Sequence, residues 1–186
     1  HRSPRPVGLR LAALLCMALS LPLALAQAAD IVPTRSVTAN GMTVLFLEQH
    51  FLPTVEIHAL VKVGSAQDPP DKAGLANLTA SLLDEGTLTR TSRQIAEQID
   101  FVGGSLEAHA AEDFTTASTR VLKKDADLGF ALLADMLQHP AFHKQEFERV
   151  RTQILGEIVS DDDDPGNVAM KAFHQLIFHG HPYSWP

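Results

Sequence analysis

Residues 54–64 alternate apolar and polar side chains, and this pattern constrains the fold more than any other feature of the chain. One side of the alternation holds Val55, Ile57, Ala59, Val61 and Val63, and the other holds Glu56, His58 and Lys62. Successive side chains of a β-strand point to opposite faces of the sheet. The segment therefore predicts a strand with one face in the core and the other in water.

Further strands are predicted on both sides of this segment. Residues 35–48 predict a hairpin, because two short runs flank Asn40-Gly41, a dipeptide that tolerates the positive φ angles of a type I′ turn. Residues 105–122 are rich in Thr, Ser and Ala and predict one or two strands. Residues 66–72, with Pro69-Pro70, predict a polar loop.

Apolar residues recur at helical spacing in the remaining segments. The predicted helices cover residues 74–85, 91–102, 125–138, 144–160 and 165–178. Thr91 and Gln94 are placed to form a capping box, and Asp164-Pro165 suits the start of the last helix after an acidic loop at 161–164. Strands, helices, strands and helices follow one another, which predicts an α+β domain with helices layered on a mainly antiparallel sheet.

The charge of the chain argues against nucleic acid as a partner. The formal net charge is −7, and no cluster of Lys or Arg occurs after the first ten residues, whereas phosphate binding needs a concentrated basic surface. The single cysteine, Cys16, allows neither an intrachain disulfide nor a Cys-based zinc site.

Residues 1–28 predict a signal peptide, so we expect an exported protein, periplasmic or secreted. Three arginines precede an apolar run at 11–26, and Ala26-Gln27-Ala28 matches the small-x-small cleavage pattern. The alternative is a membrane anchor, but Arg10 and Pro22 bracket a core shorter than the roughly 20 apolar residues that a span needs. We therefore expect no stable anchor after cleavage.

Several short motifs occur in a fixed order along residues 35–186. They are Asn40-Gly41-Met42-Thr43-Val44-Leu45, Val63-Gly64-Ser65, Lys72-Ala73-Gly74-Leu75-Ala76, Asp84-Glu85-Gly86-Thr87, Phe101-Val102-Gly103-Gly104-Ser105, Val121-Leu122-Lys123-Lys124, Pro140-Ala141-Phe142 and His181-Pro182-Tyr183. Together they resemble the N-terminal domain of the pitrilysin/insulinase metallopeptidases. Since the chain starts at His1 rather than Met and ends at Pro186, we expect a partial domain of a longer protein.

The resemblance implies where a zinc site would lie. In that family two His of an H-x-x-E-H motif bind zinc from one helical turn, the Glu acts as general base, and a Glu on a later helix is the third ligand. The motif falls on residues 77–81 here, where Asn77 replaces the first His, Ala80 the Glu and Ser81 the second His.

These replacements predict a catalytically inactive chain without a zinc ion of its own. The neutral amide of Asn77 is a poor zinc ligand, and the methyl group of Ala80 cannot accept a proton. The hydroxyl of Ser81 is weakly acidic and too short to take the place of an imidazole. Loss of the base alone should remove much of the roughly 10²–10⁴-fold that general base catalysis supplies.

Glu157 fits the third-ligand position by its distance from Asn77 along the chain. Two interpretations stay open at this stage. It is a helix carboxylate facing water, or it is a vestigial ligand that points inward and is hydrogen-bonded by Asn77 and Ser81, because a bare buried charge is costly.

Other possible metal sites have simpler explanations. His109 and Glu112 lie in a strand-like segment, which does not converge them as a helix would. His174, His179 and His181 surround a predicted turn, and residues 161–164 lack the alternating ligands of a calcium loop.

The resemblance implies a non-catalytic subunit that assists peptide binding and proteolysis by a partner carrying H-x-x-E-H and zinc. The partner would make a heteromer with this chain, and strand addition would hold the peptide. The alternatives are an active metallopeptidase with substituted ligands and a stand-alone periplasmic peptide-binding module.

Overall fold

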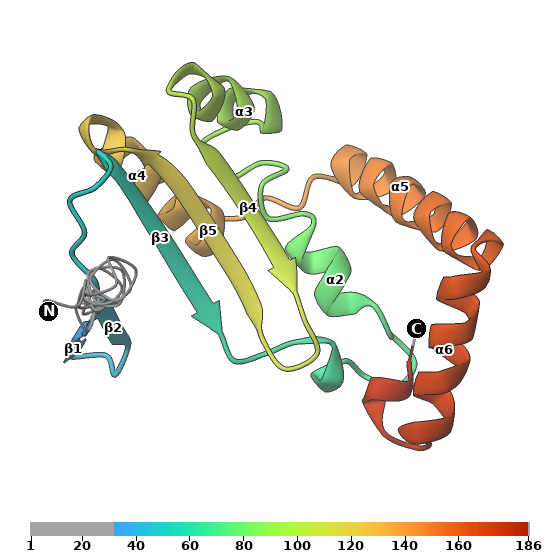
Figure 1. The fold of residues 1–186 in the computed structure, drawn as a ribbon. Helices are drawn as coiled ribbons and strands as arrows, with labels where there is room; N and C mark the ends of the chain where they lie inside the picture. The colour runs from blue at the N-terminus through green and yellow to red at the C-terminus, as the bar shows by residue number, and fades with distance from the viewer. Residues whose placement is uncertain (1–31, 186) are drawn as a thin grey trace, which may run out of the picture. The chain divides into compact units, whose positions relative to one another are not determined.

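The computed structural model describes residues 32–185, and the chain divides into two compact units, His1–His50 and Phe51–Pro186 (Figure 1). The predicted signal peptide, residues 1–28, lies outside the described residues. No helix among residues 32–185 is both long and apolar enough to cross a lipid bilayer.

The first unit contains the predicted hairpin. β1 (Thr34–Val37) pairs antiparallel with β2 (Thr43–Phe46), and Val37 lies opposite Thr43. The expected type I′ turn is wrong, because Gly41 has a φ of 85° whereas Asn40 does not have a positive φ. Residues 38–42 make a longer connection, which is closed by the N–H of Thr38 donating to the carbonyl of Met42 over 2.9 Å. This connection needs only one residue with a positive φ, Gly41.

The second unit is built on a three-stranded antiparallel sheet in the order β3-β5-β4. β3 (Thr54–Val61) and β4 (Ser105–Ala110) both pair with β5 (Thr115–Leu122), so β5 is the central strand. Together with its helices this sheet makes an α+β fold, and the predicted fold class is confirmed.

The two faces of the sheet differ as the alternation predicts. Ile57, Leu106 and Ala117 lie on the face that packs against the helices. The opposite face is exposed and polar, and there Arg120 donates to Glu56 over 3.0 Å. The alternation ends earlier than expected, because Val61 is 46% exposed where the strand stops.

Five α-helices are described: α2 (Leu75–Ala80), α3 (Ser92–Phe101), α4 (Ala126–Gln138), α5 (Lys144–Asp163) and α6 (Pro165–Ile177). Three short 3₁₀ turns, η1 (Ser65–Gln67), η2 (Lys123–Asp125) and η3 (Pro182–Ser184), accompany them. The capping box is confirmed, since Thr91 accepts from the N–H of Gln94 over 3.2 Å and Gln94 accepts from the N–H of Thr91 over 2.9 Å.

Three boundaries differ from the expected ones. The helix predicted at 74–85 ends at Ala80, because the residues after it make tighter i→i+3 bonds, such as Leu83 N–H to Ala80 at 3.2 Å. The polar loop at 66–72 begins within η1. The prediction of an acidic loop at 161–164 is wrong, because α5 continues through Asp163. Only Asp164 lies outside the helix, and it caps α6 by accepting from the N–H of Gly166 over 2.7 Å.

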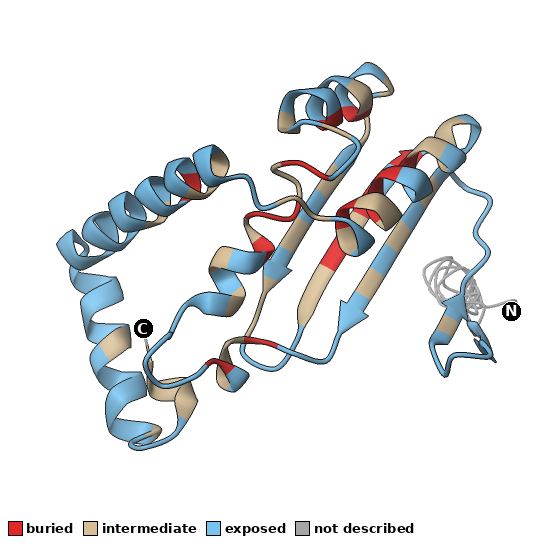
Figure 2. Cartoon of the chain, turned by 180° about the vertical axis from the view of Figure 1, so that it is seen from behind, coloured by how far each residue is buried: buried red, intermediate tan, exposed pale blue. Residues whose placement is uncertain are grey.

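The core lies between the sheet and α4, with α3 at one end. Leu132 and Met136 of α4 pack towards Val121 and Ala117 of β5, and Ile99 joins them from α3. Burying one such side chain contributes about 1.5–3 kcal/mol. Figure 2 shows the buried residues gathered over this region, whereas α5 and α6 are almost wholly exposed.

Close approach of α4 to β5 requires a glycine. A Cβ at Gly129 would lie 2.9 Å from Cγ2 of Val121, which is closer than packed carbon atoms approach. The missing side chain lets the helix lie directly on the central strand, so that Leu132 and Leu133 reach the core.

Candidate functional site

α2 carries the residues that correspond to the zinc-binding turn of the resemblance. Asp68, which is 8% exposed, determines where this helix begins: its carboxylate accepts from the N–H of Gly74 and of Ala76, each over 3.0 Å. Gly74 precedes the helix with a φ of 90°. Asp68 was not predicted as a functional residue, because no sequence signal separates it from the exposed Asp71 nearby.

Asn77, Ala80 and Ser81 lie on one turn. The N–H of Ser81 donates to the carbonyl of Asn77 over 2.9 Å, so these residues occupy the i and i+4 positions that the two histidines of an H-x-x-E-H motif need. Asn77 is exposed, Ser81 is half-buried and Ala80 is 1% exposed. Every α-helix has this spacing, and the amide, methyl and hydroxyl groups of the turn do not fit zinc.

Glu157 does not join this turn. It lies exposed on α5, and its Oε1 accepts from Nε2 of Gln153 over 3.0 Å. The expectation that Asn77 and Ser81 hydrogen-bond a buried Glu157 is therefore wrong, and the interpretation as a helix carboxylate facing water holds. The reason is that α5 buries only Val150, so the turn of α5 that carries Glu157 is left in solvent.

Gly86-Thr87, which follows α2, is anchored to α4 by Asp135. The Asp135 carboxylate accepts from the hydroxyls of Thr87 and Thr89, each over 2.7 Å, and from Nη1 of Arg90 over 2.5 Å. Burial raises the pKa of Asp135, but these hydrogen bonds and the charge of Arg90 outweigh it and lower the pKa to about 2. Its oxygens are engaged in holding the 87–90 turn, so we assign Asp135 a structural role.

This anchor borders an open hollow of about 500 Å³ on the surface of α4. The hollow is lined by Thr89, Arg90, Ala131, Ala134, Asp135, Gln138 and His139. None of these residues was predicted to form a site, because they come from two segments that are far apart in the chain.

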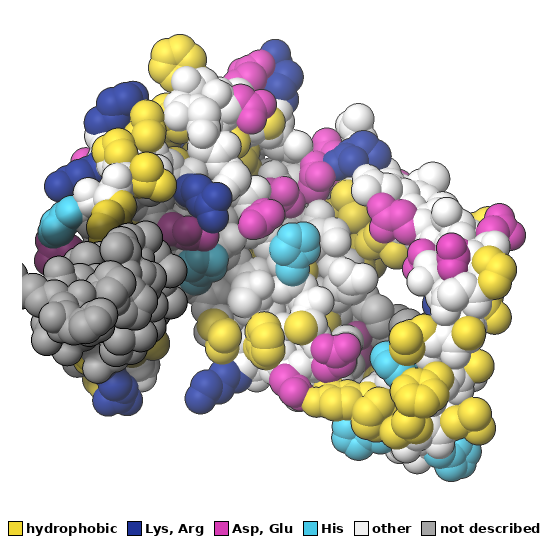
Figure 3. Space-filling model, viewed as in Figure 1, with side chains coloured by type: hydrophobic (Ala, Val, Ile, Leu, Met, Phe, Trp, Pro, Cys, Tyr) yellow, Lys and Arg dark blue, Asp and Glu magenta, His cyan; other side chains and the backbone are white. Residues whose placement is uncertain are grey.

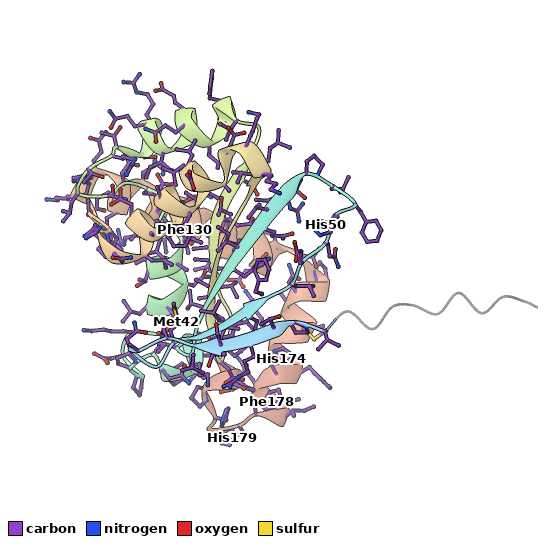
Figure 4. The ribbon with its side chains drawn as sticks, turned by 90° about the vertical axis from the view of Figure 1, so that its left-hand side faces the viewer. Met42, His50, Phe130, His174, Phe178 and His179 are labelled. Atoms are coloured by element: carbon purple, nitrogen blue, oxygen red, sulfur yellow. The ribbon has the colours of Figure 1, made fainter. Side chains whose placement is uncertain are left out.

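The other candidate metal ligands do not come together. His109 lies on the exposed face of β4, 3.7 Å from Glu107, whereas Glu112 lies in the turn after the strand. Figure 4 labels His174 and His179 at the end of α6, where the ring of His174 packs edge-on to Phe178 at 5.9 Å. Within residues 32–185 no group of three or more His, Cys, Asp or Glu side chains could hold a metal ion.

The family model for insulinase, peptidase family M16, matches residues 43–186, which include the hairpin strand β2, the whole three-stranded sheet and α2. The chain belongs to the insulinase family of peptidases.

Insulinase-family relatives of similar sequence are named as zinc proteases. An uncharacterized zinc protease of Rickettsia bellii is 32% identical over 147 residues, which is 79% of this chain and 36% of the relative. Another from Mycobacterium bovis is 33% identical over 162 residues, 86% of this chain and 36% of the relative. The chain thus spans little more than a third of the length of these relatives.

Two solved structures share the fold. The peptidase M16 inactive domain from Pseudomonas fluorescens matches with a TM-score of 0.77 and 27% identity, covering 83% of this chain and 38% of that one. A protease from Helicobacter pylori matches with a TM-score of 0.76 over 82% of this chain and 37% of its own, and at 21% identity it supports the fold alone.

Proposed function

We propose that this chain is part of an exported, non-catalytic insulinase-family subunit, which helps a zinc-bearing partner of the same family to hold an extended peptide. The observation that carries the proposal is the α2 turn. It keeps the i, i+4 spacing of a zinc-binding helix but offers Asn77 and Ser81 in place of two imidazoles, and a buried Ala80 in place of the base.

The surroundings of the turn support the same conclusion. Glu157, the residue that would complete the metal site, is exposed and bonded to Gln153. Structural zinc sites need three or four well-placed N, S or O ligands. We therefore propose that this chain holds no zinc of its own and that the partner supplies the metal. A similar protein, from Pseudomonas fluorescens, is described as an inactive domain, which supports this proposal.

The sheet offers a means of holding a peptide. β3 and β4 are the outer strands of the described sheet, and an extended peptide can add to an outer strand through main-chain hydrogen bonds. The net charge of −7 and the lack of a basic cluster outside the first ten residues are unfavourable for nucleic acid, so a peptide is the proposed ligand class.

Co-purification with a neighbouring H-x-x-E-H protein tests the proposal. We expect the two chains to form a complex that cleaves a quenched fluorescent peptide faster than either chain alone. Replacing the Glu of the partner's motif by Gln should abolish all cleavage, because the base resides in the partner. A partner that is fully active alone and does not bind this chain would contradict the proposal.

Elemental analysis separates this function from an active enzyme with substituted ligands. We expect no stoichiometric zinc in the protein after dialysis. Stoichiometric zinc that is lost in Glu157→Gln but kept in Glu148→Gln, an exposed carboxylate on the same helix, would establish the active enzyme instead. Peptide binding that needs no partner, combined with the absence of cleavage in any mixture, would indicate the stand-alone binding module.

Export is tested by sequencing the N-terminus of the protein recovered from the envelope fraction. Cleavage after Ala28 should leave Ala29 as the first residue. Recovery of the uncleaved chain from the membrane would instead support an anchor.

A further inference from the structure

Asn40-Gly41 is the one place in the sequence where a glycine follows an asparagine, and the structure puts it in the short loop between β1 and β2. The N–H of Thr38 closes this loop by donating to the carbonyl of Met42 over 2.9 Å, and Gly41 has a φ of 85°. Hairpin loops of this form end in a left-handed residue, which accounts for the glycine. Figure 4 labels Met42, which directly precedes β2.

The side-chain amide of Asn40 is folded back over the peptide group that follows it. Its Oδ1 accepts from the N–H of Met42 over 3.4 Å, a long bond of the Asx-turn type. The hydroxyl of Thr38 donates to the same oxygen. Cγ of Asn40 and the nitrogen of Gly41 therefore belong to one small hydrogen-bonded ring, and the amide oxygen faces two donors. All these contacts lie within residues 38–42.

This arrangement suits attack of the Gly41 nitrogen on Cγ of Asn40. The nitrogen loses its proton and bonds to Cγ, the bond between Cγ and Nδ2 breaks, and Nδ2 leaves with a proton as ammonia. Water then opens the cyclic imide at either of its carbonyls, which leaves aspartate or isoaspartate with a new negative charge. The amide oxygen carries negative charge during the attack, and donors aimed at such an oxygen stabilise it.

Gly41 does not hinder the ring closure. It has no side chain beside the attacking nitrogen, and an added Cβ would meet no atom within 4 Å in the part of the chain that the structure describes. Its N–H donates to the carbonyl of Thr38 over 2.9 Å, and this bond has to open before the attack. A bond in a short loop opens at a lower free energy than one inside a helix.

The other two asparagines of the sequence, Asn77 and Asn167, lie in helices. The N–H of Leu78 donates to Gly74 over 2.9 Å, and that of Val168 donates to Asp164 over 3.0 Å. Both attacking nitrogens are thus held in helical bonds and carry larger side chains next to them. Figure 3 shows hydrophobic side chains gathered over α6, the helix that contains Asn167.

We propose that Asn40 is a site of spontaneous covalent modification, where the folded loop promotes conversion of the amide to aspartate and isoaspartate. The Gly41 nitrogen is the nucleophile, and the Thr38 hydroxyl and the Met42 N–H stabilise the reacting oxygen. The site does not depend on whether the chain acts as a non-catalytic subunit.

Incubation of the folded protein in water labelled with heavy oxygen tests the site, since each conversion takes one oxygen atom from water. Peptide mapping by mass spectrometry then measures labelled aspartate and isoaspartate at each asparagine position. We expect labelling at position 40 to be at least about tenfold faster than at Asn77 or Asn167. Asn40→Gln should abolish labelling of this peptide on the same timescale, because glutamine has to close a larger ring.

Two replacements of Thr38 test the contribution of the loop. Thr38→Val should slow labelling by about threefold, a modest effect because water replaces part of what the hydroxyl supplies. Thr38→Ser keeps the hydroxyl and should keep the rate. Thr34→Val is the matched control, because Thr34 lies opposite Phe46 at the far end of the hairpin, and it should react like the wild type.

Urea separates the effect of the folded loop from that of the dipeptide. In urea the wild type and Thr38→Val should react at the same rate, because the loop that positions the hydroxyl is lost. Labelling at position 40 that is no faster than at Asn77 and Asn167 in the folded protein would overturn the site. Equal rates of folded Thr38→Val and folded wild type would overturn the role of the loop.

Discussion

The N–H of Ser81 donates to the carbonyl oxygen of Asn77 over 2.9 Å, and the two side chains lie one helical turn apart on α2. Two histidines at this spacing can bind one metal ion. In this chain the two positions carry an amide and a hydroxyl, which do not suit zinc. Asp68 accepts hydrogen bonds from the first turn of α2, and Ala80, within the 77–81 turn itself, is buried.

Ala80→Glu should lower the free energy of unfolding by about 1–3 kcal/mol, because it places a carboxylate at a position that is 1% exposed. Thr79→Glu is the matched control, since Thr79 is exposed on the same turn, and it should stay within about 0.5 kcal/mol of the wild type. Chemical denaturation measures both. Equal stability of the two variants would contradict the burial of Ala80.

Asp68→Ala should cost about 1–2 kcal/mol of stability, because the N–H groups of Gly74 and Ala76 lose their acceptor. Asp71→Ala, at the exposed carboxylate in the same loop, should have little effect. Urea unfolding of the two variants makes the comparison, and a larger loss in Asp71→Ala would show that the cap is assigned to the wrong residue.

Gly64→Ala should destabilise the protein by about 2–4 kcal/mol, because a Cβ at this position would lie 2.2 Å from the carbonyl oxygen of Ala111. The clash involves backbone atoms, so no side-chain rotation relieves it. Gly156→Ala offers the contrast, since its Cβ meets nothing within 4 Å inside α5, and it should stabilise by about 0.5–1 kcal/mol. The two melting temperatures should move in opposite directions.

Asp135 should make stability depend on acid pH. Its pKa in the folded protein is about 2, below the ordinary value of 3.8, so its contribution is fully present above pH 3.8 and is lost as the pH falls towards 2. In Asp135→Asn this part of the loss of stability at acid pH should be absent. The free energy of unfolding at neutral pH should also fall by about 1–3 kcal/mol, because Arg90 loses its charged partner. Unfolding curves between pH 2 and pH 7, measured at fixed ionic strength, test both effects; a variant whose decline matches the wild type would exclude Asp135 as the cause.

Much of the fold was predictable because it rests on local patterns. The alternation around Ile57 predicted the faces of β3, and the Thr91–Gln94 capping box and Asp164-Pro165 marked the starts of two helices correctly. The end of α2 at Ala80 was not predictable, since the apolar spacing continues through Leu82 and Leu83 while the backbone tightens.

The sequence by itself determined the family of the chain and the side chains that stand at positions 77–81, because both are written in residue identities such as Asn77 and Ser81. Only the tertiary structure decided which carboxylates serve as anchors. It brings Asp68 to the start of α2 and Asp135 to the 87–90 turn, and it leaves Glu157 in solvent. The physical reason is that burial and hydrogen bonding of a carboxylate depend on which elements pack around it, and spacing along one helix does not specify that packing.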